Sequence, residues 1–239
     1  MSVKVCVYGS GHLADATRTV CEMRLIELVV PADAEVFWVC IDMPVSQGDD
    51  SDVQGFRNEL DTAMVSVPND ALVLISTQVP VGTTASLESK YPERRFATQP
   101  ENIRIAHAVA DLQAQNRIVV GSRHDSDRPL LTNLFKNFTP GTIHFFSPES
   151  AEMVKHSLNA FLAMEIVFAN EIADICDEVG ADRDHVSLGL RSDRRVGDGP
   201  LKPGGPYTGG TLGRDVVVLN KHGAGPLLRA IKASNDARL

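Results

Sequence analysis

A lysine and an asparagine stand one helical turn apart in the second half of the chain. Lys155 and Asn159 are separated by four positions within a run of helical spacing, so they share one face of the predicted helix. A lysine beside a hydroxyl or carbonyl group can donate or accept a proton, and an amide can orient the same oxygen. For an isolated pair of this kind a solvated helix face is the favoured alternative.

A glycine-rich turn near the N-terminus has the residues to hold a phosphate group. Residues 9–14 (GSGHLA) match the pattern G-x-G-x-x-A directly after a strand-like run and at the start of a helical one. Glycines let the backbone approach a pyrophosphate, and the N-terminus of a helix offers N–H groups to it. The turn predicts a dinucleotide site that includes Gly9, Gly11, His12 and Leu13, with a plain tight turn as the alternative.

Strands and helices alternate through the first 147 residues and must position this turn. Short apolar runs predict strands at 3–8, 36–41, 72–76, 117–121 and 142–146, with helices at 13–23, 53–67 and 128–137. Alternation of this kind implies a parallel sheet covered by helices on both faces. We therefore expect an α/β, Rossmann-like sheet domain over residues 1–147.

The character of the sequence changes after residue 147. Pro148 opens a helical pattern with glutamates in its first turn, and the pattern continues to Val179, where Gly180 supplies a stop signal. Such a helix would span roughly 45 Å. The remainder is expected to be helical apart from a glycine- and proline-rich stretch at 197–213. We predict a second, all-α domain over residues 148–239 built on the long helix.

The composition narrows the class of protein. The 239 residues are 43% hydrophobic and 23% charged, as in ordinary soluble globular proteins, and the net charge of −8 argues against nucleic-acid or anionic-membrane partners. No leader and no apolar stretch long enough to span a bilayer is found, so the cytoplasm is the expected location. The four cysteines are scattered without metal-ligand spacing, which predicts buried free thiols and no metal site.

Segments around Lys155 and Asn159 resemble the central helix of the UDP-glucose and GDP-mannose dehydrogenase family. Residues 148–155 (PESAEMVK) run into 159–163 (NAFLA), and 170–172 (NEI) follow. This match is specific because it extends over most of the predicted long helix, so the lysine–asparagine pair is not isolated.

Further segments in the same order carry the resemblance over nearly the whole chain. Residues 76–84 (STQVPVGTT) look like the family's S-T-V-P-x-G-T-T loop. Residues 100–104 (PENIR) with 117–121 (RIVVG) are similar to its P-E-F-L-R…R-I-V-I-G block, and 203–215 (PGGPYTGGTLGRD) resemble its P-G-x-G-F-G-G-S-C-F-P-K-D loop.

The resemblance implies roles for individual residues. In that family two NAD-dependent hydride transfers convert the primary alcohol of a nucleotide sugar to a carboxylate, and a cysteine holds the aldehyde between the two steps. Matched by position, Lys155 and Asn159 would contact the reacting oxygen. Asp215 and Thr77 would work with a water molecule, and Glu101 would serve the hydrolytic step.

The resemblance also implies contacts around the cofactor and the substrate. Pro44 and Thr77 would join the glycine turn in binding NAD, and Arg195, Tyr207 and Gly209 would lie near the substrate. The family's long helix packs against its mate in a dimer, which implies a homodimer here. The apolar positions available for that contact, which could instead pack within their own domain, are Phe161, Ile166, Phe168 and Ile172.

Several departures weaken the family's full reaction. Thr211 falls at the position of the cysteine, and a threonine hydroxyl is a far weaker nucleophile at neutral pH. Met43 replaces a threonine that the family uses near the nicotinamide. The usual ribose-binding acid has no clear counterpart, because Glu27 lies within a short strand-like segment at 25–30.

Two larger losses are expected with these substitutions. Between Gly11 and Phe37 the chain is too short for the usual second strand, its acid and the following helix–strand unit. The sequence stops near Leu239, where the family would add a third domain that covers the nucleotide.

Two functions from different classes stay open. One is an NAD-dependent oxidoreductase that performs at most one hydride transfer from a small molecule, either a nucleotide sugar or another hydroxy compound, as the related β-hydroxyacid dehydrogenases do without a cysteine. The other is a non-catalytic ligand-binding or scaffold homologue that no longer turns over NAD. Retention of Lys155 and Asn159 favours the first function, and the number of departures favours the second. A separate chain supplying the missing domain is also compatible with the sequence.

Overall fold

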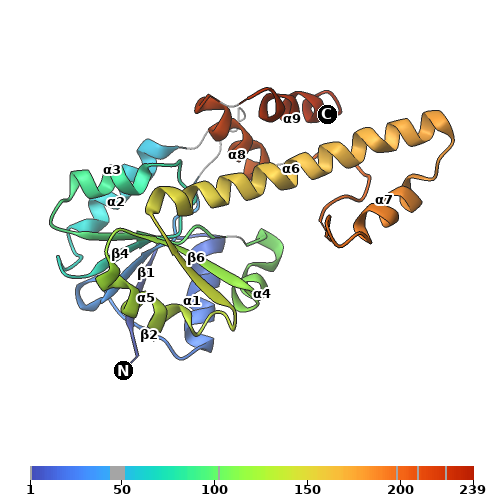
Figure 1. Cartoon of the computed structure of the whole chain (residues 1–239). Coiled ribbons are helices and arrows are strands. Elements are labelled where there is room, and N and C mark those ends of the chain that lie inside the picture. Colours follow the sequence, from blue (N-terminus) through green and yellow to red (C-terminus); the bar gives the residue numbers. More distant parts are fainter. Residues whose placement is uncertain (1, 44–51, 102, 198, 209, 224) are drawn as a thin grey trace. The chain divides into compact units, whose positions relative to one another are not determined.

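The structure, a computed structural model, describes residues 2–43, 52–101, 103–197, 199–208, 210–223 and 225–239 (Figure 1). The chain divides between Lys155 and His156 into two compact units. The first unit contains the sheet, and the second contains the helices that follow. The predicted domain boundary at residue 147 stays a prediction.

The first unit is built on a seven-stranded sheet of order β2-β1-β3-β4-β5-β6-β7. Every neighbouring pair is parallel except β5 and β6, which are antiparallel, so the predicted sheet is confirmed as mostly parallel. The strands are β1 Lys4–Tyr8, β2 Glu27–Leu28, β3 Val36–Val39, β4 Leu72–Ile75, β5 Arg95–Thr98, β6 Arg117–Ser122 and β7 Thr142–Phe146.

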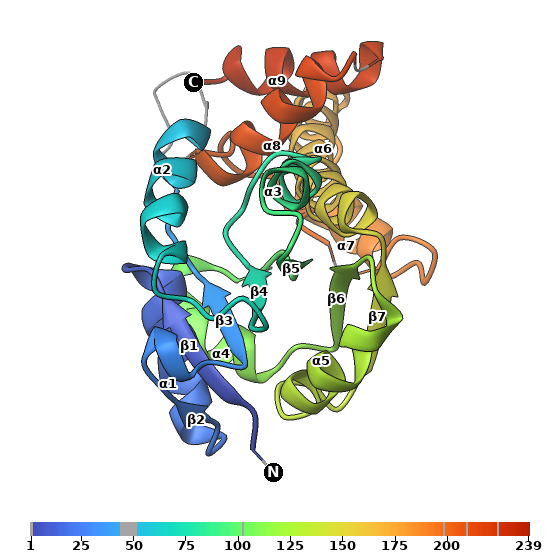
Figure 2. The same ribbon diagram turned by 90° about the vertical axis from the view of Figure 1, so that its left-hand side faces the viewer.

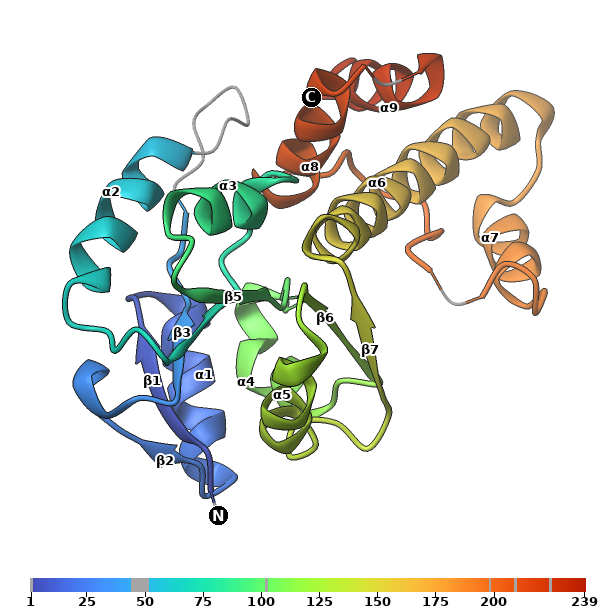
Figure 3. The same cartoon turned by 60° about the vertical axis from the view of Figure 1, so that its left-hand side comes forward.

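Helices cover both faces of this sheet (Figures 2 and 3). Successive strand residues point to opposite faces, so in β3 Val36 and Trp38 join one core cluster while Phe37 and Val39 join the other. The helices packed on the first face are α1 His12–Met23, α4 Ala108–Gln113 and α5 Arg128–Phe135. Those on the second face are α2 Val53–Met64 and α3 Thr83–Lys90.

The expected loss of the second strand is wrong. β2 pairs in parallel with β1, with Lys4 opposite Glu27 and Val5 opposite Leu28. The connection from β2 to β3 is a single 3-10 turn, Pro31–Asp33, with no intervening helix–strand unit. Only two residues of β2 are paired with β1. The backbone of Val29 extends this pairing, because Val29 N donates to Val5 O at 3.0 Å.

The predicted long helix, α6, runs over Pro148–Val179 and is confirmed at both ends. Gly180 follows it with φ of 75°, a left-handed conformation that glycine adopts without steric cost. Residues 148–155 of α6 belong to the first unit, and the rest of the helix belongs to the second.

Three further helices follow α6 in the second unit: α7 Arg183–Arg191, α8 Gly210–Lys221 and α9 Pro226–Asp236. The predicted irregular stretch at 197–213 is therefore too long, because α8 begins at Gly210. Helices α6, α8 and α9 share a small apolar core made of Ala160, Ala163, Val167, Val216, Leu219 and Ile231.

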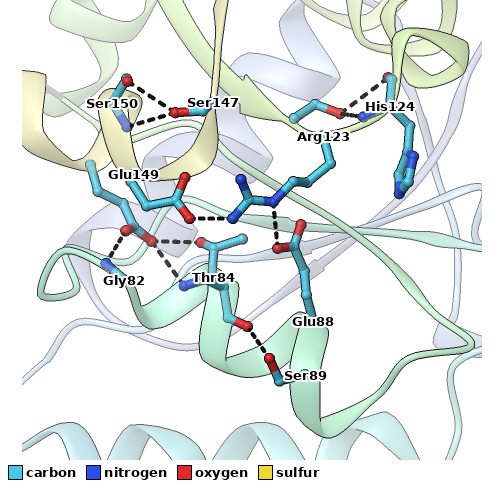
Figure 4. A network of polar contacts seen from close by, with 12 residues as sticks. Gly82, Thr84, Glu88, Ser89, Arg123, His124, Ser147, Glu149 and Ser150 are labelled. Atoms are coloured by element: carbon cyan, nitrogen blue, oxygen red, sulfur yellow. Dashed lines mark hydrogen bonds and ion pairs between the residues drawn. The ribbon is translucent and has the colours of Figure 1, made fainter.

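A buried carboxylate of α6 fixes the start of α3. Glu152 is 1% exposed, and its carboxylate accepts hydrogen bonds from Gly82 N at 2.6 Å, Thr84 N at 3.0 Å and Thr84 Oγ1 at 2.6 Å. The N-terminus of a helix leaves such N–H groups without intrahelical partners and attracts negative charge. Figure 4 shows Gly82 and Thr84 beside Arg123, whose guanidinium bridges Glu88 and Glu149.

Burial raises the pKa of the Glu152 carboxyl above its ordinary value of 4.5, and the hydrogen bonds from Thr84 and Gly82 oppose this shift. The folded state therefore holds this proton more tightly than the unfolded chain. The resulting stabilisation is complete below pH 4.5 and is lost as the pH rises through the folded-state pKa.

We therefore expect Glu152→Gln, which cannot ionise, to gain free energy of unfolding relative to the unmodified protein as the pH rises above 4.5. Urea unfolding of both proteins between pH 4.5 and 8 measures this difference. Glu149→Gln is the matched control, because Arg123 holds the pKa of Glu149 below its ordinary value. The difference in free energy of unfolding between Glu149→Gln and the unmodified protein should change with pH only below pH 4.5. A Glu152→Gln difference that is independent of pH would contradict the assignment.

Candidate active site

The glycine turn has the predicted strand–turn–helix form. It joins β1 to α1, and Gly9 and Gly11 have φ angles of 126° and 97°. A Cβ on Gly9 would lie 2.3 Å from the carbonyl oxygen of Cys40, so only glycine allows the turn to pack against the end of β3. Arg18 supports the turn from α1 by donating to Gly9 O at 2.7 Å.

A carboxylate of the protein itself lies on this turn. Asp42 Oδ2 accepts from His12 N at 2.7 Å, and Asp42 Oδ1 accepts from Leu13 N at 3.3 Å. A Cβ on Gly11 would lie 2.3 Å from Asp42 Oδ2. The carboxylate thus takes the N–H groups and the space that were predicted to receive a pyrophosphate. The backbone of the turn fits a dinucleotide, but with Asp42 in this position the turn does not accept its phosphates.

Hydrogen bonds at the carboxyl ends of the strands bring Asp42 to the turn. Cys40 N donates to Tyr8 O at 2.7 Å, which continues the pairing of β3 with β1. Ile41 N donates to Thr77 Oγ1 at 2.9 Å. Thr77, predicted to serve both catalysis and cofactor binding, is 1% exposed at the end of β4 and holds the segment that carries Asp42.

Trp38, the only tryptophan, does not face the glycine turn. Its Nε1 donates to Ser76 Oγ at 2.7 Å, and its ring meets Phe135 and Phe138 edge-on at centroid distances of 5.4 and 5.5 Å. The indole is enclosed in the core beneath α5 and cannot report on a ligand at the turn by direct contact.

Within the first unit, Lys155 and Glu101, each expected to serve the catalytic site, lie close together. Lys155 Nζ is 4.0 Å from Glu101 Oε1, and the two side chains are 5% and 13% exposed. Glu101 Oε2 also accepts from Ile103 N at 2.6 Å, which fixes the carboxylate. At 4.0 Å the contact is an ion pair without a hydrogen bond, so it does not engage the protons of the ammonium group.

Within the second unit, three polar side chains form a buried cluster between α6 and α8. Asp215 is fully buried and accepts a hydrogen bond from the amide of Asn159 through Oδ2. Its Oδ1 lies 2.7 Å from His156 Nδ1, which donates because a carboxylate can only accept. Asn159 and Asp215 are thus brought together, and His156 is a member that sequence reasoning missed. Its position three residues before Asn159 on one helix face was the available signal.

Thr211, which was expected at the position of the family's cysteine, has an exposed side chain. Thr211 is the second residue of α8, one turn before Asp215. None of the four cysteines, which are buried and free as predicted, has the exposure of a reactive thiol. Burial raises the pKa of Cys21 to about 12 and also raises that of Cys40, so these two are protonated at neutral pH.

The residues expected near the substrate have other partners in the second unit. Arg195 is exposed, and its guanidinium is held by Asp193, with Nη2 and Oδ2 2.6 Å apart. Tyr207 is bound through its backbone to the side chain of Asn235 at 2.9 and 3.2 Å. Gly209 and the cofactor candidate Pro44 lie outside the described residues.

Two kinds of feature are absent from the described residues. The helices there include none with the length and apolar character needed to cross a bilayer. That same part of the chain holds no group of three or more histidine, cysteine and acidic residues placed to bind a metal ion.

Comparison with known protein families gives two matches along the chain. Residues 149–237 match the central domain of the UDP-glucose/GDP-mannose dehydrogenase family, and residues 25–139 match the NAD-binding domain of the same family. The match to the NAD-binding domain begins after the glycine turn. The interpretation of the turn as a dinucleotide site therefore depends on the geometry of the turn alone.

Individual relatives agree with these matches. The UDP-glucose 6-dehydrogenase YwqF of Bacillus subtilis is 31% identical over 79% of this chain and 44% of its own length. A UDP-D-ManNAc dehydrogenase from Pyrococcus horikoshii shares the fold with a TM-score of 0.81, at 20% identity over 98% of this chain and 68% of that chain. A 3-hydroxyisobutyrate dehydrogenase from Mycobacterium tuberculosis shares the fold with a TM-score of 0.74, at 12% identity over 97% of this chain and 91% of that one. The chain spans about half the length of the curated relatives it matches.

Proposed function

The chain belongs to the UDP-glucose/GDP-mannose dehydrogenase family, whose NAD-binding and central domains it carries, and on this premise we propose that it is an oxidoreductase that makes one hydride transfer from a hydroxy substrate. The substrate is a nucleotide sugar or a smaller hydroxy compound. A nicotinamide dinucleotide, when bound, accepts the hydride in this chemistry.

The observation that carries the proposal is the state of Lys155. Its ammonium is nearly enclosed, lies beside the Glu101 carboxylate at 4.0 Å, and keeps its protons available. Asn159 follows one turn later on the same helix, with its amide orientation fixed by Asp215. A surface pair would have neither the burial nor these partners, so the solvated-face alternative is not supported.

The proposed proton chemistry uses Lys155 in both directions. In oxidation, the neutral amine takes the proton from the hydroxyl oxygen. The carbon that bears this oxygen releases its hydride to the nicotinamide acceptor, and a carbonyl group forms. In reduction, the ammonium returns the proton to the carbonyl oxygen as the hydride arrives. Glu101 lies 4.0 Å from Lys155 Nζ and helps to position the lysine, and Asn159 orients the reacting oxygen.

The reaction is proposed to stop at the carbonyl level. A second oxidation by the family's route needs a thiol that adds to the aldehyde. The corresponding position holds the hydroxyl of Thr211, a far weaker nucleophile at neutral pH, and buried cysteines do not replace it.

We expect Lys155→Met to lower kcat/KM by about 100-fold or more, because general acid–base groups contribute on that scale. Turnover is measured as NADH formation at millimolar NAD with UDP-glucose, UDP-D-ManNAc and 3-hydroxyisobutyrate, the compounds named for relatives. Lys136→Met, which removes an exposed lysine after α5, is the matched control and should leave turnover unchanged. Undiminished turnover in a folded Lys155→Met protein would remove Lys155 from the proposed role.

A second candidate function is a ligand-binding homologue without turnover. The specific observation in its favour is Asp42, whose carboxylate lies on the N–H groups at the start of α1. On this reading Lys155 and Asn159 hold a sugar ligand and transform nothing.

The two functions predict different results from calorimetry combined with an assay. Under the second candidate, one of the sugar nucleotides binds without NAD, Asn159→Ala weakens that binding by about tenfold, and no NADH forms under any condition. The weakening follows from loss of a fixed hydrogen-bonding group, worth about 1.4 kcal/mol at tenfold. Reproducible NADH formation that depends on substrate rules this candidate out.

We also propose that α6 mediates a homodimer. Phe161, Phe168 and Ile175 are 53%, 45% and 53% exposed, and their seven-residue spacing aligns them in one apolar stripe along the helix. The other two positions expected at this contact, Ile166 and Ile172, are half-buried. Ile172 lies beside the stripe, one turn after Phe168, whereas Ile166, two residues before Phe168, points to the opposite side of the helix. The described residues of the second unit leave this stripe uncovered in a single copy.

Light scattering at micromolar concentration should give twice the 25.9 kDa mass of one chain. Phe168→Asp, in the middle of the stripe, should shift the protein towards the monomer because it places a charge in an apolar contact. Leu227→Asp, at an exposed position of α9, is the control and should leave the mass unchanged. A monomer in the unmodified protein at this concentration would rule out the proposed dimer.

A further inference from the structure

We propose that Asp42 is an internal anion that occupies the dinucleotide site, so that the chain binds a dinucleotide only when this side chain withdraws. This proposal depends on the proposed function in one respect only, which is that the dinucleotide is NAD. It concerns a residue that neither the glycine pattern nor the retained family motifs point to.

The carboxylate reproduces the contacts expected of a phosphate group. Its two oxygens receive the backbone N–H groups of His12 and Leu13 at 2.7 and 3.3 Å, the first two residues of α1. It also lies against the backbone of Gly11, where a Cβ would come within 2.3 Å of Oδ2. The close backbone approach that a glycine provides for a pyrophosphate is therefore used by Asp42.

A pyrophosphate cannot share this place with Asp42. Both groups are anionic, both need the same N–H donors, and the space beside Gly11 admits only one of them. Binding therefore requires the carboxylate to leave, so the apparent dissociation constant equals the intrinsic constant divided by the fraction of molecules in which Asp42 has withdrawn.

The position of Asp42 suits a reversible contact. The side chain is exposed, while its neighbours Ile41 and Met43 are buried in the core cluster that includes β3 and α2. The backbone is therefore anchored on both sides, and rotation of the Asp42 side chain into water disrupts no apolar packing. The cost of withdrawal is the loss of the two hydrogen bonds to α1.

The test is NADH binding by isothermal titration calorimetry on the full chain. We expect Asp42→Ala to bind NADH at least tenfold more tightly than the unmodified protein. Asp42→Asn should show a smaller gain, because its amide oxygen can still accept from the same N–H groups without the negative charge. Should Asp42→Ala fail to fold, the gain with Asp42→Asn decides the question.

Asp15→Ala is the matched control. Asp15 is an exposed acid in the first turn of α1, so its removal changes the charge near the turn by the same amount. It accepts from Arg18 and not from the N–H groups of His12 or Leu13. NADH affinity within about twofold of the unmodified protein is expected for this variant.

Equal NADH affinities in the unmodified protein and a folded Asp42 variant would overturn the proposal, whether both bind or neither binds up to millimolar NADH. A gain as large in Asp15→Ala would also overturn it, because net charge alone would then explain the effect. The proposed oxidoreductase function fails separately. Tight NADH binding by Asp42→Ala without turnover that depends on Lys155 would rule out the oxidoreductase function and would leave the proposed role of Asp42 supported.

Discussion

A carboxylate placed at the start of a helix is the interaction on which much of the sheet unit depends. Helices α1 and α3 both begin after a glycine with positive φ, and neither Gly11 nor Gly82 has a side chain that could cap the helix. In each case an acid from elsewhere in the chain accepts the free N–H groups, Asp42 for α1 and Glu152 for α3. The first contact fixes the edge of the sheet near the glycine turn, and the second fixes the start of α6.

The distance between partners explains which features the sequence could predict. Helix α6 was predicted at both ends because Pro148 and Gly180 lie at its own boundaries. Helix α3 was missed because few of its residues are apolar and its capping acid lies 68 positions away. The candidate site divides in the same manner. Lys155 and Asn159 follow from spacing and family resemblance, whereas the pairing of His156 with Asp215 joins residues 59 positions apart.

The residues expected to match the family's polar groups and the one expected to match its cysteine have different surroundings in this chain. Lys155, Asn159 and Asp215 are present, buried and engaged with partners, so they constrain the fold as well as any chemistry. Thr211 is exposed at the start of a helix and constrains little. The cluster around Asp215 would be costly to lose, because removal of one member would take a hydrogen bond from its buried polar partner.

The enclosure of Trp38 has a spectroscopic consequence. The only tryptophan of the chain sits in the sheet unit, edge-on to two phenylalanines and hydrogen-bonded to Ser76. Its fluorescence will therefore change when the sheet unit unfolds and will be silent for helices α7 to α9. Circular dichroism in the far ultraviolet, to which those helices contribute strongly, follows both units. Disagreement between the two signals along a denaturant series would separate the stabilities of the two units without any labelling.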